Sequence, residues 1–249
     1  MIKFFRKIRQ NLLSENKFNK YILYAIGEIT LVVIGILVAV QINAWYQKRT
    51  LKINETNTLS QLNIDLKENH KELSEMYEMI EASNVAGEKI LDHLKYRNEV
   101  TDSLRYWIEE FNISNIFNNA NTTYKNLENS ENNIISNDSL RLRITLMYEK
   151  DFANVHKREA MFYTEHYTNY KNELLKNFKT GPVFYQWLEK ATLEVNTPID
   201  FNDLKRNETY KNAMVELYNF RLLRLHWLKS SLEDLENLIK DIEKEISKQ

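Results

Sequence analysis

The stretch that decides the fold occupies residues 21–40 and reads YILYAIGEITLVVIGILVAV. Its 20 residues contain one charged side chain, Glu28. An α-helix rises about 1.5 Å per residue, so this segment can cross the roughly 30 Å hydrocarbon core of a bilayer. Aromatic residues stand near both ends, as at membrane interfaces, namely Tyr21, Tyr24 and Trp45. We therefore predict a transmembrane helix over residues 21–45.

Two other interpretations of this segment are weaker. A core helix of a soluble domain is rarely this long and this apolar. A cleaved signal peptide needs a short basic region and a small-x-small cleavage site. Here 20 residues precede the apolar run, and the sequence VQINAWYQKR at its end lacks a clean A-x-A site. The pattern favours an uncleaved signal anchor.

The flanking charges predict the orientation of the span. Six Lys and Arg side chains precede it in residues 1–20, whereas three follow it in residues 46–65. Basic residues tend to stay on the cytoplasmic side of a membrane. We therefore expect the N-terminus in the cytoplasm and residues 46–249 on the opposite, periplasmic side.

The first 20 residues have a second pattern. Apolar side chains recur at helical spacing, and four basic side chains alternate with them: Lys3, Arg6, Lys7 and Arg9. This is typical of a basic amphipathic segment that lies on an anionic membrane surface. The alternative, which is compatible with the first, is that these charges only set the topology. In both cases the lipid bilayer is a predicted partner.

The composition limits the fold of the remaining residues and the classes of function. The 249-residue chain contains 4 Gly and 2 Pro, too few turn residues for an all-β sandwich or barrel. It has no Cys, which excludes disulfides, thiol catalysis and Cys-ligated metals. With 34 basic and 35 acidic residues the net charge is −1, which argues against nucleic acid as a partner.

Residues 46–249 have the periodicity of long helices. One helix is predicted over 51–96, where a seam recurs every three or four residues. That seam consists of Leu59, Leu62, Leu66, Asn69, Leu73, Met76, Ile80, Ser83, Gly87, Ile90 and Leu94. A last long helix is predicted over 207–247, with the heptad seam Leu225, Leu228, Leu232, Leu235, Ile239, Ile242 and Ile246.

Another long helix is predicted between these two. It begins at Asn137 or Asp138, both good N-cap residues, and ends at the Gly181-Pro182 stop. Shorter helices are predicted over 100–111, 122–129 and 183–192, with connections at 112–121, 132–137 and 196–198. These elements predict an all-α fold, a transmembrane helix followed by an antiparallel helical bundle with coiled-coil-like helices. The seams could be covered within the chain or by another chain.

No motif for catalysis or metal binding is present. The chain lacks H-E-x-x-H, Walker A, G-x-G-x-x-G and G-x-S-x-G sequences. None of its five His residues follows a Glu by three positions, as a di-metal bundle would need. We expect no catalytic residue, no metal and no cofactor, and hence a protein that is not an enzyme.

Two groups of side chains in the bundle could still form a site. The aromatic residues near His166 could make a ligand box, but their spacing favours core packing: Phe162, Tyr163, Tyr167 and Tyr170. For His166 a hydrogen bond to a neighbour is favoured over a metal or proton site. His226 stands in a sequence typical of a solvated helix face, beside Arg221, Arg224 and Trp227.

Glu28 is the most informative side chain of the span, because an ionisable residue there suggests a function. At 100° per residue, Gly35 and Ala39 lie within about 20° of Glu28 around the helix. Gly35 and Ala39 form a small-xxx-small pair, which lets another helix approach closely. These residues predict a helix-packing face, used for self-association or for docking on another membrane protein. Snorkelling of Glu28 to the headgroups and proton coupling, as in stator subunits of proton-driven motors, are the alternatives.

The chain has a basic start, an AIGE segment at 25–28 and a QIN exit at 41–43. In these features it resembles a bacterial domain-of-unknown-function family of single-span membrane proteins. A second shared stretch covers 123–127 and 135–140, with Glu131 where the family usually has Gly. The resemblance implies a bacterial inner-membrane protein with no assigned activity, and it supplies no catalytic residues.

The combined pattern predicts a membrane-anchored, non-enzymatic bundle that serves as an interaction, scaffold or sensing module. The alternative is an accessory subunit of a larger, proton-coupled inner-membrane complex that uses Glu28. An enzyme with an unrecognised site is a third hypothesis. It would require titratable side chains that converge in a polar pocket between helices.

Overall fold

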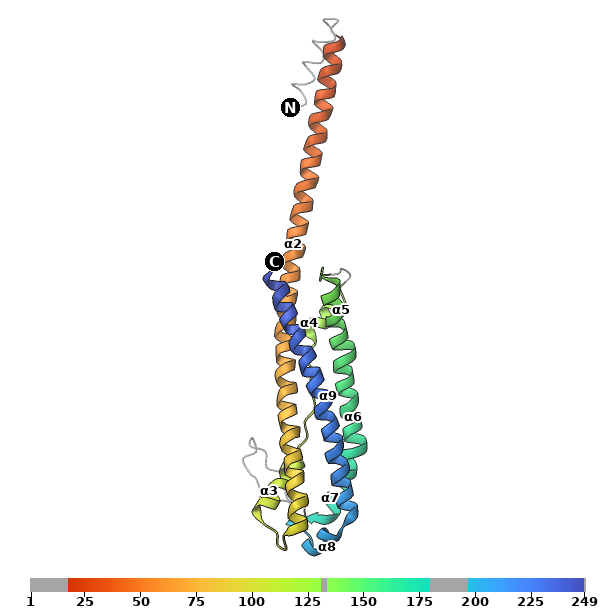
Figure 1. Ribbon diagram of the computed structural model, residues 1–249. Coiled ribbons are helices and arrows are strands. Elements are labelled where there is room, and N and C mark those ends of the chain that lie inside the picture. The colour runs from red at the N-terminus through yellow and green to blue at the C-terminus, as the bar shows by residue number, and fades with distance from the viewer. Residues whose placement is uncertain (1–17, 131–133, 180–196, 249) are drawn as a thin grey trace, which may run out of the picture. The chain divides into compact units, whose positions relative to one another are not determined.

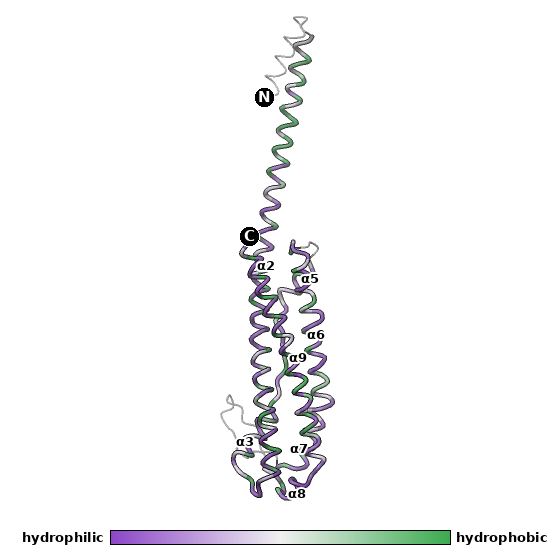
Figure 2. Tube along the Cα trace, in the orientation of Figure 1, coloured by the Kyte–Doolittle hydropathy of each residue, from purple (hydrophilic) through white to green (hydrophobic). Residues whose placement is uncertain are grey.

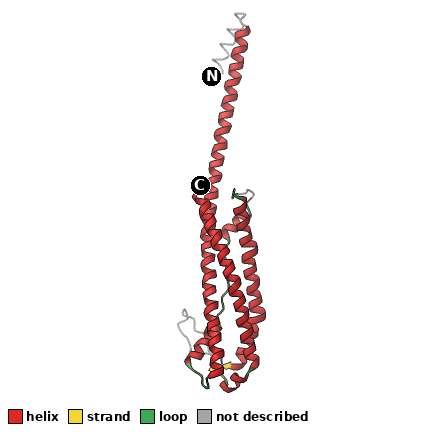
Figure 3. Ribbon diagram, viewed as in Figure 1, coloured by secondary structure: helices red, strands yellow, loops and turns green. Residues whose placement is uncertain are grey.

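The computed structural model describes residues 18–130, 134–179 and 197–248 (Figure 1). Figure 3 shows that nearly all of these residues are helical. The strands in this part of the chain, β1 (Phe178–Lys179) and β2 (Thr197–Pro198), have two residues each. The all-α prediction is therefore confirmed. The chain divides into two compact units, Met1–Glu55 and Thr56–Gln249.

The described residues of the first unit belong to helix α2, whose bounds are Phe18–Tyr96. Large apolar side chains cover this part of α2 on all faces, from Ile22 to Ile42, and they are exposed. Figure 2 shows the same part as a largely hydrophobic tube. The most apolar window has a mean hydropathy of 2.3, and none of it is buried. The N-terminal helix is thus long and apolar enough to cross a membrane.

Long helical segments build the second unit: α2 from Thr56 onward, Asp138–Asn177, and α9 (Glu208–Ser247). All eleven predicted seam positions of α2, from Leu59 to Leu94, are buried. The predicted seam of α9 is buried at Leu228, Leu235, Ile239 and Ile242, and half-buried at Leu225, Leu232 and Ile246. Residues of this unit therefore cover both seams.

Polar pairs fix the direction of α9 against α2. Lys67 Nζ lies 2.7 Å from Glu243 Oε1, and further along α2 the hydroxyl of Tyr218 donates to Glu88. Residue numbers rise on one helix as they fall on the other, so the two helices are antiparallel.

The same holds for α9 and the segment Asp138–Asn177. Arg143 pairs with Asp241, and His166 Nδ1 lies 3.2 Å from Glu216 Oε1. The antiparallel bundle expected from the sequence is present, with α9 running side by side with both partners (Figure 1).

The segment Asp138–Asn177 alternates between α and π geometry. It consists of α5 (Asp138–Leu146), η1 (Met147–Phe152), α6 (Ala153–Met161), η2 (Phe162–Tyr167) and α7 (Thr168–Asn177). Met147 and Phe152 are five residues apart, and both are buried. Tyr148, four residues before Phe152, is buried as well, so the core side of the segment continues through the π turn.

The end of this segment differs from the prediction. The helix stops at Asn177, before Gly181-Pro182, because Phe178 has an extended backbone (φ −127°, ψ 143°) and buries its ring. Strand β1 then pairs antiparallel with β2, so Thr197 and Pro198 form a strand instead of a turn. The helix predicted over 183–192 lies outside the described residues.

Short helices complete the second unit. Helices α3 (Asp102–Phe111) and α4 (Thr122–Glu128) agree with the sequence, whereas α8 (Phe201–Arg206) was not predicted. Four helices begin at residues whose side chains accept a hydrogen bond from a backbone N–H of the first turn: Thr101, Asn137, Asp200 and Asn207. These caps satisfy donors that would otherwise lack partners and so set where the helices start.

Residues 112–121, which we call the strap, connect α3 to α4 without helix or strand. The amide of Asn69 on α2 donates to Ala120 O over 3.0 Å and accepts from Ala120 N–H over 2.6 Å. Phe117, in the middle of the strap, is fully buried. The predicted connection is thus irregular as expected, but it is packed against the helices, and side chains satisfy its backbone groups.

Two apolar cores lie along the bundle. One contains Phe117, Phe152 and Leu228 with the first half of the α2 seam. The other contains Phe111, Phe162 and Tyr170 with the second half, including Ile90 and Leu94.

Candidate functional site

The residues predicted to form the packing face of the span lie on α2 in the first unit. Gly35 and Ala39 are exposed and Glu28 is half-buried. A Cβ atom built on Gly35 meets nothing within 4 Å in the described part of the chain. Helical geometry puts the three residues on one side, so a second helix can approach there. The predicted membrane-surface residues lie outside the described residues, namely Lys3, Arg6, Lys7 and Arg9.

The second unit contains a cluster of buried charged side chains between its two apolar cores. Arg221 and Arg224 of α9 are 1% and 4% exposed, and Glu159 of α6 is 4% exposed. The core around Leu228 ends on one side of them along α9, and the core around Phe220 lies on the other. His226 is exposed, as predicted, but the solvated face does not include its neighbours Arg221 and Arg224.

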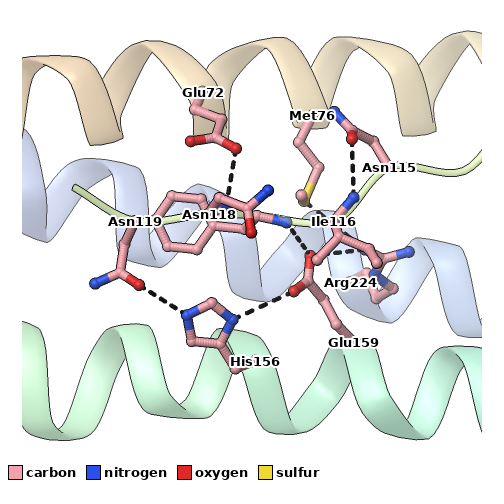
Figure 4. Close-up of polar contacts among 10 residues, drawn as sticks. Glu72, Met76, Asn115, Ile116, Asn118, Asn119, His156, Glu159 and Arg224 are labelled. Carbon is pink, nitrogen blue, oxygen red and sulfur yellow. Dashed lines mark hydrogen bonds and ion pairs between the residues drawn. The ribbon is translucent and has the colours of Figure 1, made fainter. Parts of the chain in front are cut away.

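Glu159 connects the strap to α9 (Figure 4). Its Oε1 accepts a hydrogen bond of 3.0 Å from the backbone N–H of Phe117. Arg224 Nη2 lies 3.8 Å from the same oxygen and 3.7 Å from Met76 Sδ on α2. One carboxylate and one guanidinium therefore bring α2, α6, α9 and the strap together.

Two side chains on either side of the strap extend this network (Figure 4). His156 Nδ1 lies 3.6 Å from Glu159 Oε2, and its Nε2 is 3.0 Å from Asn119 Oδ1. From α2, Glu72 accepts a hydrogen bond of 2.9 Å from the backbone N–H of Asn118. The strap is held at consecutive residues by helices on opposite sides of it.

Arg221 lies about one turn before Arg224 and reaches the start of the strap. Its Nη2 donates to Ile113 O over 3.0 Å. Its guanidinium carbon lies 4.6 Å from the ring centre of Phe111, and that of Arg224 lies 4.2 Å from the ring centre of Phe162. A desolvated cation–π contact contributes about 2 kcal/mol, which offsets part of the cost of burying these charges.

Burial sets the proton affinity of the cluster. It raises the pKa of the Glu159 carboxyl, although the Phe117 N–H, Arg224 and His156 all oppose the rise. Burial lowers the pKa of Arg221 to about 10. It also lowers the pKa of Arg224, against the attraction of Glu159. Both arginines remain cations at neutral pH, so the cluster holds permanent buried charge.

The aromatic residues near His166 pack as part of a core. Phe162 and Tyr170 are fully buried. His166 stacks on Phe220 with ring centres 4.0 Å apart and contacts Glu216, as the sequence predicts for a histidine bonded to a neighbour. In the described ranges, no three His, Cys, Asp or Glu side chains gather where they could hold a metal ion.

The sequence pattern does not predict the burial of the two arginines, because the predicted seam of α9 begins at Leu225. Followed from Leu228 toward the N-terminus in steps of four and three, the same periodicity passes through Arg224, Arg221 and Leu217. Leu217 is fully buried. Extending the period would have placed both arginines in the core, where a cation requires an explanation.

No protein-family model, no curated protein and no solved structure matches this chain. The resemblance to a bacterial domain-of-unknown-function family therefore stays a prediction, and the function is argued from the residues and their geometry alone.

Proposed function

We propose that the protein is a single-pass protein of a bacterial inner membrane whose span associates side by side with a second transmembrane helix. The N-terminus lies in the cytoplasm, and the bundle lies in the periplasm as a non-enzymatic interaction or scaffold module. The observation that carries this proposal is the pair of small, exposed residues Gly35 and Ala39 on an apolar helix, on the side that also carries Glu28.

The exposure of the span supports a membrane location. Its apolar side chains, such as Leu31 at 65% and Leu37 at 62% exposed, lack cover from the described residues. Exposing apolar surface to water costs roughly 25 cal/mol per Å². A helix that is apolar on every face needs lipid or protein around it.

The distribution of small residues supports association on one face. At Gly35 and Ala39 the backbone of a neighbouring helix can approach closely, which strengthens packing where lipid supplies no hydrophobic driving force. Glu28 lies on the same face, and a protonated carboxyl there can donate a hydrogen bond across the contact. Such bonds in membranes contribute about 1–2 kcal/mol.

The bundle supports the scaffold part of the proposal. It covers its own seams, so its long helices do not need another chain to bury their apolar stripes. We therefore assign association to the span, and we propose that the bundle is a folded module on the periplasmic side.

The absence of Cys allows a direct test by disulfide cross-linking in native membranes. Ala39→Cys places a thiol on the proposed face, and Leu37→Cys places one about 180° from Glu28. Two copies that pack through this face bring the Ala39→Cys thiols within disulfide reach, about 4.4–6.8 Å between Cα atoms. We expect a covalent dimer with Ala39→Cys and none with Leu37→Cys.

Equal cross-linking of the two variants, or none in either, contradicts self-association through this face. Chemical cross-linking and mass spectrometry of the same membranes identify any other protein at the span. A different membrane protein there would favour the accessory-subunit alternative.

The orientation is tested with a membrane-impermeant maleimide on cells with a permeabilised outer membrane. Ser230→Cys, on an exposed position of α9, should be labelled, and Asn11→Cys should not. The reverse pattern contradicts the proposed topology.

A further inference from the structure

The buried cluster of the bundle has an excess of positive charge. It contains two guanidinium groups, and Glu159 is the acid within ion-pair distance, 3.8 Å from Arg224. Arg221 makes no ion pair with any residue in the described ranges. A buried charge is costly unless an opposite charge or hydrogen-bonding groups compensate it. One of the two cations thus lacks a counter-charge.

The donors of Arg221 are incompletely used as well. Nη2 donates to Ile113 O, but Nη1 is buried and has no acceptor among the residues that the structure describes. The ring of Phe111 covers one face of the guanidinium. The N–H groups lie in the guanidinium plane, so this contact stabilises the charge without accepting their protons.

The polar contacts of Arg224 with the described residues are long. Its Nη2 lies 3.7 Å from Met76 Sδ and 3.8 Å from Glu159 Oε1. A charge-assisted hydrogen bond is typically about 2.7–2.9 Å long. Glu159 therefore compensates the charge of Arg224 only weakly, one turn away from the unsatisfied Nη1 of Arg221.

A small cavity adjoins both side chains. Its volume is about 10 Å³. Its walls include Met76, Ile80, Ile113, Phe162 and the two arginines, and no Asp or Glu of the described residues lines it. Such a volume is the minimum for one water-sized particle, so a slightly larger ion needs the flexible side chains of Met76 and Met79 in the wall to move.

We propose that this cavity binds one monovalent anion of halide size, which in the cell is chloride, between Arg221 and Arg224. The anion accepts the Nη1–H of Arg221 and supplies the missing negative charge. A water molecule would accept the proton but leave the charge unbalanced. Sulfate and phosphate are too large for the cavity. The proposal concerns the bundle alone and stands or falls independently of how the span associates.

The test measures binding to the full-length protein in a mild detergent. Chloride-35 NMR line broadening reports exchange of chloride with a protein site. We expect broadening that bromide competes away and that gluconate or sulfate at the same ionic strength does not. The Arg221→Met variant, which keeps the length and removes the charge, should lose the broadening. Arg158→Met, a half-exposed arginine of α6 that lies over Trp227, is the matched control and should keep it.

Thermal unfolding gives a second reading of the same site. The unfolding temperature of the wild type should rise saturably with chloride or bromide at constant ionic strength, and that of Arg221→Met should not. Broadening that is absent in the wild type, or unchanged in Arg221→Met, overturns the proposal and leaves water as the occupant.

If circular dichroism shows that Arg221→Met does not fold, the wild-type protein still provides a test. Crystals of the wild type grown in bromide should then show an anomalous peak between the two guanidinium groups. A map without that peak overturns the proposal.

Discussion

The span and the bundle place apolar and charged side chains in opposite surroundings. In the span, apolar residues such as Leu31 and Leu37 are exposed, and the acid Glu28 stands among them. In the bundle the apolar seam residues are buried, and the cations Arg221 and Arg224 are buried with them. Helix α2 contains both apolar patterns within its 79 residues.

Periodicity separates the two regions. Along 29–40 almost every residue of α2 is apolar, whereas from Leu59 onward apolar residues recur in steps of three and four. A helix that is apolar all round needs a continuous apolar medium, and a helix with one stripe can be covered by its own chain. Each region should therefore respond to a different kind of substitution.

The largest expected effect is the loss of a buried ring from the bundle. Phe117 is fully buried, with its ring centre 5.3 Å from that of Phe152 and 5.5 Å from that of His156. Phe117→Ala should lower the free energy of unfolding by about 3–5 kcal/mol, because it leaves a cavity in the core. Urea unfolding of the full chain in mild detergent, followed by circular dichroism, measures the change.

The neighbouring Ile116→Ala is the control, since Ile116 is 51% exposed. It should change stability by no more than about 0.5 kcal/mol. Similar losses in both variants would mean that the strap is not packed as described. Ala39→Cys cross-linking should survive in Phe117→Ala, because the span does not share this core.

Two glycines of α2, one in the span and one in the bundle, allow a direct comparison of the two regions. A Cβ on Gly87 would lie 2.5 Å from Cε2 of the buried Phe111 ring, whereas a Cβ on Gly27 meets no atom of the described residues within 4 Å. Gly87→Ala should destabilise the bundle by about 1–3 kcal/mol through overpacking. Gly27→Ala should leave the same unfolding curve unchanged. A stable Gly87→Ala variant would show that Phe111 can shift without cost.

Substitution of Glu28 tests the span. Glu28→Leu should weaken helix association by about 1–2 kcal/mol, because the hydrogen bond across the contact is lost. Glu28→Gln keeps a donor and an acceptor and should associate nearly as well as the wild type. The yield of the Ala39→Cys dimer measures both. Loss of cellular function in Glu28→Gln with intact association would instead favour the proton-coupled alternative.

The smallest expected effect is a pH dependence at Glu159. Burial raises the pKa of this carboxyl in the folded protein above its unfolded value of about 4.5. Its contribution to stability is therefore fully present below that value and is lost as the pH rises through the folded pKa. The charged groups that face it are Arg224 of α9 and His156 of α6.

Glu159→Gln removes this titration. The difference in unfolding free energy between the wild type and Glu159→Gln should fall as the pH rises from 4 toward neutrality. Urea unfolding over a pH series measures it. A difference that rises with pH would mean that the attraction of Arg224 outweighs burial.

The long helices could be predicted because their apolar residues are periodic and their ends are marked. Asn137 and Asn207 are the N-cap residues of two long helices, and the sequence predicts the starts of these helices there. The strap could be predicted only as irregular. Its burial depends on Asn69, Glu72 and Glu159, which lie 42 to 51 residues from their partners in the strap. Such long-range contacts leave no local pattern.

The π segments and the buried cluster could not be predicted by assuming ordinary helices. Ile144, Tyr148, Phe152 and Val155 are buried in ordinary steps of four and three, so the apolar pattern carries no sign of the π turns. Arg221 and Arg224 are charged residues at core positions, where hydropathy alone predicts solvent exposure. The residue type therefore gives the wrong burial here, because the contacts that hold both arginines come from distant parts of the chain.

The hydrogen bonds of the strap have a mechanical consequence. Asn69 holds Ala120 from α2, Glu159 holds Phe117 from α6, and Arg221 holds Ile113 from α9. Sliding one of these helices by a single residue, about 1.5 Å, would bend or lengthen these bonds of 2.6 to 3.0 Å, and a bent hydrogen bond is weaker. The strap therefore opposes sliding of the three helices past one another.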